Sequence, residues 1–571
     1  MKNNNIIFII LLSLLGLSVG CTEDFLDRPP KDTLVDANFY NSDEQVLAGT
    51  AVLYNAAWKT YVDQSNFQLG DIRGGSVYRA WGNRDAVTFN ITPVSASNEQ
   101  AYRSFFVTIG QSNLAINNIN AFAGAEVSEN VKQHAIAEAR FMRAVAYMHL
   151  VMNYGAVPII ENNLDHLDNP QLRRNTVESV WEFIQKDFEF AAAHLSVESL
   201  APGRLTKWSA LGMLARTHLT LAGLGATPGN RDQSHLDDAM AYADSVITMS
   251  GKSLMSKYED LFLYPYDNNN ESLFELQWVF SLAPNGYDAS NTMVSQITYS
   301  NSIAANGDGW GGDLSASWWM LSLYDGLIRD NGATPGFSND ERLKATFMLP
   351  GFTYPEIVQT VTDENGVSTE QDLVFEDPGD VDFSYASIKK YVVGKADGNA
   401  DRQRYPNNTY MMRLAEMYLI YAEAALGNNA STADAKALEY FNAVHKRAGL
   451  GEFPPQTNPT AELTWQMIFE ERIKEFAMES MAWYDLVRLH YYNPNEAYNI
   501  INNQYRGLFV VKPNQWPDPT AWTFEQTSWS EFSYPSANSG NFLLPIPASE
   551  ASQAPSLGLD PIPYEFEGGS E

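Results

Sequence analysis

The sequence predicts a mainly α-helical protein in which helix pairs stack into one scaffold that carries large irregular loop inserts and minor β-hairpins. Helical periodicity of apolar residues occurs in two stretches, roughly 129–249 and 414–490. Between them, roughly residues 250–408 are rich in Gly, Asn, Asp, Pro and aromatic residues, which is typical of irregular loops. The 571 residues include one cysteine, so stability must come from burial and not from disulfides.

The first 20 residues have the features of a lipoprotein signal peptide. Lys2 precedes an apolar run from Ile6 to Leu17, which is shorter than the about 20 residues that span a bilayer. Small residues then lead to Cys21, where a lipoprotein signal peptidase would leave the cysteine as the first mature residue. We therefore expect Cys21 to be lipidated and to anchor the protein. An ordinary secretory signal beside an incidental cysteine is the alternative.

Four helices are expected in the N-terminal part. Residues 129–154 place apolar side chains on a wide face, and Gly155 followed by Pro158 ends the helix. Three further helices are expected at 176–194, 207–224 and 236–249.

The C-terminal part repeats this pattern. One helix starts near Leu414 and ends at Gly427, and a second covers 433–448. A third, long helix is expected over 463–490. Its glutamates recur at helical spacing beside basic residues, so we expect a solvated, salt-bridged face made by Glu470, Glu471, Glu475 and Glu479.

Two regions are expected to form loops. One is the interruption at 250–408, in which Asn365 and Gly366 predict a β-hairpin with a type I′ turn. The other is a loop-rich insert at 66–100. Binding residues concentrate on loops that a rigid scaffold positions.

No Pro/Ser-rich or charged linker divides the chain, so we expect one domain over 21–571, with an N-terminal part of about 21–330 and a C-terminal part of about 331–571. The helix pairs resemble tetratricopeptide units, although no clean 34-residue repeat is present. Pairs of this kind bury their faces only by stacking, so the two helical stretches should pack together.

The net charge of −32 disfavours nucleic acid as a ligand, and no run of Lys or Arg offers a basic patch. Aromatic residues make up 12% of the chain, with 13 Trp and 29 Tyr. Some of these rings should lie outside the core, and a neutral ligand is favoured.

Five segments resemble motifs of the SusD/RagB family of outer-membrane nutrient-binding lipoproteins of Bacteroidota. They are the acidic start Cys21 to Asp27, the helix core 139–144 with 154–158, 203–207, 413–424, and 471–476 with 483–488. Pro545, Ile546, Pro547 and Glu550 are similar to the family's C-terminal stretch, but the residues after them depart from it.

The resemblance implies a cell-surface, carbohydrate-binding lipoprotein of polysaccharide utilisation and nutrient uptake. Such a protein has a SusD-like, tetratricopeptide-containing fold, captures an oligosaccharide or polysaccharide, and delivers it to a SusC-like TonB-dependent transporter in the outer membrane. The family implies neither catalysis nor a cofactor, so we expect no catalytic residue and no bound metal.

A neutral sugar needs exposed rings for stacking and polar side chains for its hydroxyl groups. Two glycine-rich loop clusters offer both, and we expect the glycan contacts there. The first cluster supplies Asp71, Arg73, Tyr78, Trp81, Asn83 and Arg84; the second supplies Trp278, Tyr287, Asp308 and Trp310. Trp310 is the strongest candidate because no regular element surrounds it, although it could also plug a local core. Trp278 lies in an apolar run, which favours burial.

Other functions lack a signature. No Gly-x-Ser-x-Gly motif is present, and the eight histidines are scattered. Asp267, Asn269 and Glu271 alternate as calcium ligands can, but a polar turn is the simpler interpretation. Three alternatives to glycan capture remain at this stage: a peptide-uptake lid, a protein-binding helical-repeat adaptor, and a surface glycoside hydrolase.

Overall fold

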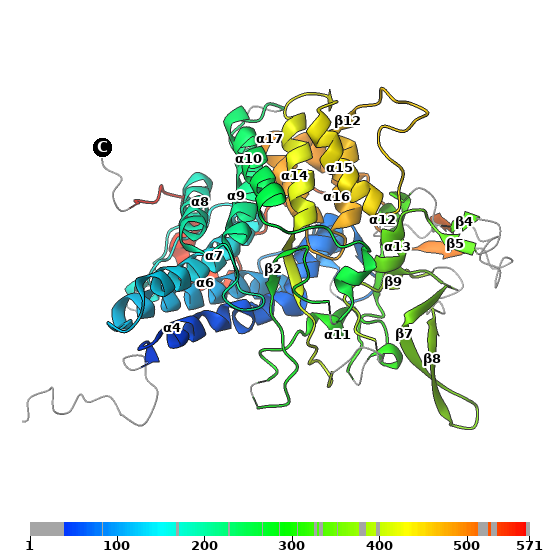
Figure 1. Ribbon diagram of the computed structural model, residues 1–571, viewed down its shortest axis with the longest axis horizontal. Coiled ribbons are helices and arrows are strands. Elements are labelled where there is room, and N and C mark those ends of the chain that lie inside the picture. Colours follow the sequence, from blue (N-terminus) through cyan, green and yellow to red (C-terminus); the bar gives the residue numbers. More distant parts are fainter. Residues whose placement is uncertain are drawn as a thin grey trace, which may run out of the picture.

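The computed structural model describes residues 39–566, apart from 83, 167–170, 227–228, 265, 285, 305–306, 325–327, 331–334, 351, 376–383, 395–399, 512–523 and 527–533. The expected signal peptide and Cys21 lie outside the described residues. Helices form the upper and left parts of the molecule in Figure 1, and the loop-rich region with its small strand pairs lies at the lower right. The expected mainly α fold is confirmed.

The longer helices come from two separate parts of the chain. They are α4 (Asp43–Thr50), α6 (Ala96–Phe122), α7 (Glu129–Tyr154), α8 (Val177–His194), α9 (Lys207–Leu221), α10 (Gln233–Met249), α14 (Leu414–Leu426), α15 (Ala435–Arg447), α16 (Trp465–Glu475), α17 (Ala482–Tyr492) and α18 (Pro494–Asn502). The shorter ones are α5 (Asp85–Thr88), α11 (Met293–Ile297), α12 (Trp318–Ser322), α13 (Glu341–Thr346) and α19 (Ala548–Gln553). Tyr61–Ser65 and Gln68–Ile72 are π-helical.

Local signals determine where several of these helices begin and end. The Ser128 hydroxyl accepts a hydrogen bond from the Val131 amide and caps α7, and the Thr176 hydroxyl caps α8 in the same way. Helix α7 ends at Gly155, which has a φ of +70°. The predicted bounds of α7 are therefore confirmed at both ends.

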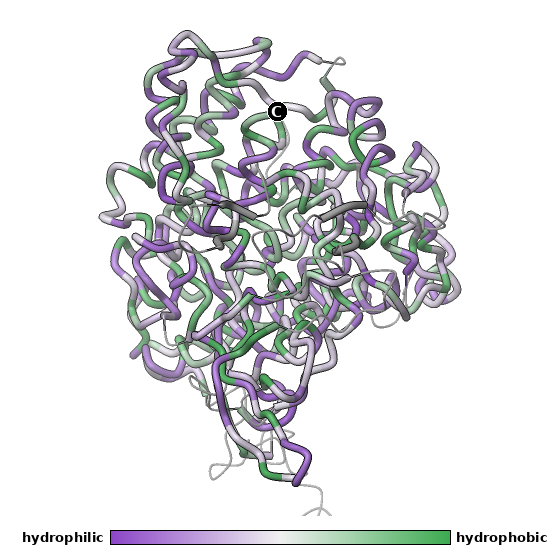
Figure 2. Tube along the Cα trace, turned by 90° about the vertical axis from the view of Figure 1, so that its right-hand side faces the viewer, coloured by the Kyte–Doolittle hydropathy of each residue, from purple (hydrophilic) through white to green (hydrophobic). Residues whose placement is uncertain are grey.

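The helices stack in chain order. Consecutive helices from α6 to α10 pack against one another, and α10 then packs against α14, which contacts both α15 and α16 (Figure 1). The α10–α14 contact joins the two helical stretches across the loop-rich interruption, as expected. Hydrophobic and hydrophilic residues alternate along the helices (Figure 2), which suits elements with one buried face. Within the described residues, no helix is both long and apolar enough to cross a membrane.

Helix α6 differs from expectation, since its first residues fall in the loop-rich insert expected at 66–100 and no helix was expected between 100 and 122. The helix has 27 residues, and many of its buried positions carry small polar side chains. Ser104, Thr108 and Asn113 are buried, and each bonds to a main-chain carbonyl, Thr108 to that of Ala57 at 2.9 Å. Polar residues on a buried face weaken the hydrophobic periodicity that marks a helix.

The single long helix expected over 463–490 is wrong, because α16 and α17 are separate. The chain between them turns through Met478 and Ser480, which have φ values of +62° and +63°. The buried Asp71 carboxylate accepts hydrogen bonds from the amides of both residues, at 2.8 and 3.0 Å. A side chain some 400 positions away therefore stabilises a left-handed conformation that ordinary residues rarely adopt.

The solvated glutamate face expected on 463–490 is also wrong. Glu471, Glu475 and the carboxylate of Glu479 are buried, whereas Glu470 is partly exposed. Their partners are buried cations contributed by other elements: Arg342, Arg413, Arg447 and Lys390. The helical spacing of the glutamates along α16 agrees with the prediction. Their partners are distant in the sequence, and by packing over this face they shield it from solvent.

The strands form two-stranded antiparallel pairs. The pairs are β1 (Val77–Arg79) with β3 (Leu314–Ala316), β2 (Ser272–Leu276) with β10 (Thr409–Arg413), β4 (Ile328–Asp330) with β5 (Pro335–Phe337), β6 (Phe347–Met348) with β9 (Ser387–Ile388), β7 (Thr353–Thr362) with β8 (Ser368–Val374), β11 (Ser431–Thr432) with β12 (Leu463–Thr464), and β13 (Phe509–Val511) with β14 (Phe524–Gln526).

The predicted hairpin is β7–β8, which projects at the lower right of Figure 1. Its turn is not type I′. The amide of Asp363 donates to the carbonyl of Val367 at 2.9 Å, which leaves a three-residue loop, and of Asn365 and Gly366 only the glycine has a positive φ. A three-residue loop with glycine in the left-handed region is the next most common hairpin connection.

Candidate functional site

Strands β1 and β3 bring together the two glycine-rich clusters that the sequence analysis selected separately. Beyond the end of β1, the Ala80 amide donates to the Asp313 carbonyl at 2.8 Å. The Arg79 guanidinium also lies 3.0 Å from the Asp313 carboxylate. Trp81 directly follows this contact, and Trp310 lies three residues before it. The ladder therefore places both candidate tryptophans on neighbouring loops, although more than 220 residues separate them in the chain.

Both tryptophans are exposed, with 58% of Trp81 and 48% of Trp310 accessible. The alternative in which these rings plug a local core does not hold in this structure. The main chain of Trp310 is nevertheless fixed, since its amide donates to the Ser295 carbonyl at 2.8 Å. A rigid backbone that carries an exposed ring suits stacking against a ligand.

The glycines around Trp310 serve the packing of the loop itself. A Cβ added to Gly309 would lie 2.7 Å from the main chain of Ser300, and one added to Gly311 would lie 2.4 Å from that of Ile297. The loop can therefore press against 297–300 only because side chains are absent. In the first cluster, Gly70 and Gly74 likewise pack against the main chain at 480–483. These glycines therefore serve close packing within the protein.

Tyr287 is the third exposed ring among the candidate site residues, at 38%. Its hydroxyl donates to the Gln403 side chain at 3.0 Å, and the Lys59 ammonium lies 4.0 Å from its ring centroid. The chain at 402–405 also contacts the segment 307–313, which we call the Trp310 loop, because the Asp308 amide donates to the Arg402 carbonyl at 2.8 Å. Tyr287 and the Trp310 loop therefore share one supporting segment.

Two polar candidates, Asp308 and Arg84, are half-buried. The Asp308 carbonyl accepts a hydrogen bond from the Tyr405 hydroxyl at 2.8 Å. The Arg84 side chain donates to the Tyr78 hydroxyl at 2.8 Å. Asn83 lies outside the described residues.

Four candidates are buried and have no surface to offer a ligand in this structure: Asp71, Arg73, Tyr78 and Trp278. Burial raises the pKa of Asp71 to about 6, although its amide partners favour the charged form. The Arg73 guanidinium donates to the Phe542 carbonyl and lies 3.9 Å from the Trp483 ring centroid. The Trp278 indole donates to the Thr409 hydroxyl at 3.1 Å. These interactions correct our expectation of ligand contact, since each links distant parts of the chain.

Two polar side chains that were not among the expected site residues, Lys59 and Gln64, support the segments that carry the exposed rings. Lys59 donates to the carbonyls of Tyr287 and Ser290, at 2.6 and 2.8 Å, and burial lowers its pKa to about 8. Gln64 donates to Gln296, the residue after the Ser295 carbonyl that holds Trp310. Nothing in the local sequence distinguishes these residues, because their roles depend on contacts across more than 200 positions.

The three possible calcium ligands, Asp267, Asn269 and Glu271, have separate partners within the protein. The Asp267 carboxylate accepts a hydrogen bond from the Asn408 amide at 3.1 Å, and the side chain of Asn269 accepts one from the Glu271 amide at 2.9 Å. The Glu271 carboxylate is fully buried and pairs with Arg413 at 2.5 Å. Each group is thus bonded separately within the protein.

Comparisons with known proteins give one consistent answer over nearly the whole chain. A model of the SusD family matches residues 270–559, and a model described as "Starch-binding associating with outer membrane" matches residues 24–219. A SusD-like protein of Bacteroides ovatus is 35% identical over 569 residues, which covers 96% of each chain. The starch-binding protein SusD of Bacteroides thetaiotaomicron is 24% identical over 428 residues, 71% of this chain and 72% of that protein.

Solved structures agree with these matches. A crystal structure with xylogluco-oligosaccharide is 32% identical, covers 91% of this chain and 99% of its own, and superposes with a TM-score of 0.77. A laminarin-binding SusD-like protein is 20% identical, with a TM-score of 0.63 over 90% of this chain and 98% of its own. This second likeness concerns the fold alone.

Proposed function

Because this chain belongs to the SusD family of carbohydrate-binding proteins associated with the outer membrane, we propose that it captures an oligosaccharide or polysaccharide on the surface that carries Trp81, Tyr287 and Trp310. The observation behind this proposal is the exposure of three aromatic rings on loops that hydrogen bonds join and fix. We name this surface the three-ring surface.

The chemistry of a sugar matches the three-ring surface. Sugar rings present apolar C–H faces that stack on aromatic rings, and their hydroxyl groups need hydrogen-bond partners when they leave water. Asp308, Gln296 and Gln403 lie on or beside the loops that bear the rings and offer polar groups. A neutral glycan also avoids the Coulomb repulsion that a polyanion would meet at a chain with a net charge of −32.

The protein binds its glycan without turnover in this proposal. It holds the glycan at the cell surface, anchored through lipidated Cys21, and delivers it to a SusC-like TonB-dependent transporter. The family match and the N-terminal sequence support this arrangement. A Cys21→Ala variant should leave the membrane fraction of the cells that express it, and an unchanged membrane fraction would argue against lipid anchoring.

Isothermal titration of the purified full chain tests the capture proposal. The panel contains xylogluco-oligosaccharide, which occurs in the structure of the 32% identical relative, together with starch and laminarin oligosaccharides and acidic polysaccharides. Trp81→Ala and Trp310→Ala should each weaken binding about tenfold or more, because each removes a stacking ring. Phe122→Ala is the control, since Phe122 is 38% exposed but lies at the end of α6.

Binding of a neutral glycan with the expected loss in both tryptophan variants, and without release of reducing ends, would support capture. Release of reducing ends would indicate a hydrolase. No detectable binding to any glycan of the panel would favour peptide uptake or a protein-adaptor role. Binding that both variants leave intact would place the glycan away from the three-ring surface.

A further inference from the structure

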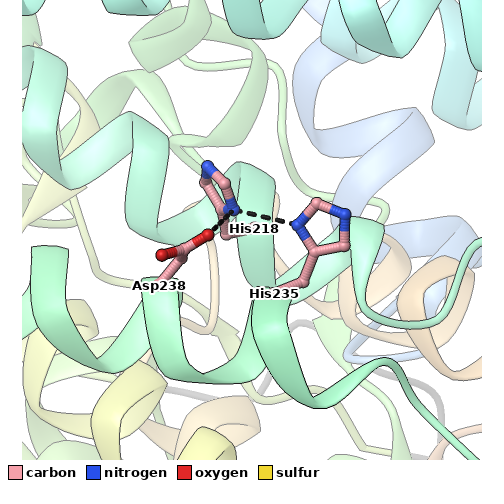
Figure 3. A group of neighbouring side chains, drawn as sticks. All are labelled: His218, His235 and Asp238. Carbon is pink, nitrogen blue, oxygen red and sulfur yellow. Dashed lines mark hydrogen bonds and ion pairs between the residues drawn. The ribbon is translucent and has the colours of Figure 1, made fainter.

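The fold brings together two histidines and an aspartate that the sequence leaves scattered. His218 lies in the last turn of α9, and His235 and Asp238 lie near the start of α10 (Figure 3). The Nδ1 atoms of the two histidines are 3.0 Å apart, and Oδ2 of Asp238 is 3.4 Å from Nδ1 of His218. One ligand atom from each residue lies within 4.8 Å of the other two, the one such group of three among the described residues.

These separations suit a shared metal ion. Tetrahedral ligands at about 2.0–2.1 Å from Zn²⁺ lie about 3.3 Å from one another. The two distances from Nδ1 of His218 lie on either side of that value, and the third pair of ligand atoms lies within 4.8 Å, so side-chain movements alone would complete the site. Two imidazole nitrogens and one carboxylate oxygen form a donor set that Zn²⁺ and similar transition metals accept, whereas Ca²⁺ and Mg²⁺ prefer oxygen ligands alone.

The helices position the three groups with little freedom. His235 and Asp238 are three residues apart on α10 and therefore point to the same side of that helix. Helix α9 packs along this side and supplies His218, which is only 4% exposed and is flanked by the Tyr242 ring. Asp238 is 56% exposed in its side chain, so an ion and a water molecule can reach the group from solvent.

We propose that His218, His235 and Asp238 form a binding site for one divalent transition-metal ion, typically Zn²⁺, with a fourth position open to water. The ion connects α9 to α10 close to the loop that joins them. The site is independent of the three-ring surface, and its role is to hold this helix pair together. A ligand that binds only the folded state stabilises it, so the metal should raise the midpoint of unfolding.

The competing explanation is a simple hydrogen bond. Two neutral imidazoles 3.0 Å apart can share one proton between their Nδ1 atoms and need no metal. The two explanations differ in what happens to Asp238, because a shared proton does not require this carboxylate and a metal does.

The test uses the untagged full chain in detergent, stripped of metals with EDTA and then dialysed. Zn²⁺ is titrated by calorimetry, and bound zinc is counted after a second dialysis by elemental analysis. We expect one ion per chain, at least a tenfold loss of affinity in His235→Ala and in Asp238→Asn, and no change in His194→Ala. His194 is an exposed histidine on the neighbouring helix α8 and controls for non-specific binding.

A second readout separates metal binding from misfolding. Co²⁺ bound to the wild-type chain should give the visible absorption of a tetrahedral site, and Asp238→Asn should lose it while its circular dichroism and its urea midpoint without metal stay unchanged. The proposal is overturned if Zn²⁺ does not bind at about 0.1 mM, or if both variants bind it as the wild type does. It is also overturned if His194→Ala removes the binding.

Discussion

Acid should remove the stability that Glu475 contributes, because this carboxylate is charged and buried among three guanidinium groups. One of its oxygens accepts a hydrogen bond from Arg413 at 2.9 Å and one from Arg447, and the other lies 3.3 Å from Arg342. Burial alone would raise the pKa of Glu475, but the attraction of the three arginines lowers it to about 2.

The sign of the pH effect follows from this lowered pKa. A carboxyl group whose pKa falls from 4.5 in the unfolded chain to about 2 in the folded protein stabilises the fold above pH 4.5. That contribution is lost as the pH falls from 4.5 towards 2. The difference between the two pKa values corresponds to about 3 kcal/mol, and about 2 kcal/mol of it is lost by pH 3.

The variant Glu475→Gln isolates this contribution from that of neighbouring carboxylates. At pH 7 it should be less stable than the wild type by about 3 kcal/mol, because a buried charge pair has lost one partner. Between pH 7 and pH 3 the difference should shrink by about 2 kcal/mol, since only the wild type has this group to protonate. Urea unfolding followed by tryptophan fluorescence measures both values.

The control is Glu470→Gln, which changes a partly exposed glutamate on the same helix and should shift stability by less than about 1 kcal/mol at every pH. If the difference between Glu475→Gln and the wild type stays constant or widens as the pH falls, Glu475 is not charged within the folded protein.

Two further substitutions test the structural role of Asp71 and the close packing at Gly311. Asp71→Ala removes the acceptor of the Met478 and Ser480 amides and should lower the free energy of unfolding by about 3 kcal/mol in urea unfolding; an unchanged value would contradict its role in separating α16 from α17. Gly311→Ala places a Cβ 2.4 Å from the main chain of α11 and should weaken glycan binding about tenfold, because it displaces the loop that carries Trp310. Gly312→Ala is the control and should have a smaller effect, since its added Cβ would lie 3.2 Å from the nearest atom. Equal affinities of the two variants in titration calorimetry would contradict this prediction.

The sequence predicted those helices whose ends carry local signals. Helix α7 starts after the Ser128 cap and stops at Gly155, so both of its bounds could be read from nearby residues. Helix α6 was missed because its buried face carries hydroxyl and amide groups. The break between α16 and α17 could not be predicted either, since its cause is the distant carboxylate of Asp71.

The exposure of the candidate site residues could likewise be predicted only in part, because it also depends on distant contacts. Trp81, Tyr287 and Trp310 lie in loops without regular structure, and all three are exposed. Asp71 and Arg73 have the same local surroundings in the sequence but are buried by partners at 478–480 and 541–542. The loop expected around Asp71 is also wrong, because Gln68–Ile72 is π-helical. Glycine-rich surroundings therefore do not always mark a loop, and they do not distinguish a side chain that faces solvent from one that holds two distant segments together.

The segments that carry the family resemblance are mainly structural. Arg413, Glu416, Glu423 and Arg472 are buried, and they form ion pairs that connect α14 to α9, α16 and α17 or to the loop before α10. Similarly, Arg143 of α7 pairs with Asp187 of α8 at 2.8 Å. Buried charges are costly without their partners, so these motifs indicate the fold and leave the glycan unspecified.

A crystal structure of the chain with the oligosaccharide that binds most tightly in the titration panel would show directly whether the glycan lies on the three-ring surface. We expect sugar rings stacked on Trp81 and Trp310, with Tyr287 in contact and the main chain at 307–313 unmoved. Glycan bound elsewhere, for example in the polar pocket lined by Arg204, Ser209 and Glu275, with both tryptophans still exposed to solvent, would contradict this expectation.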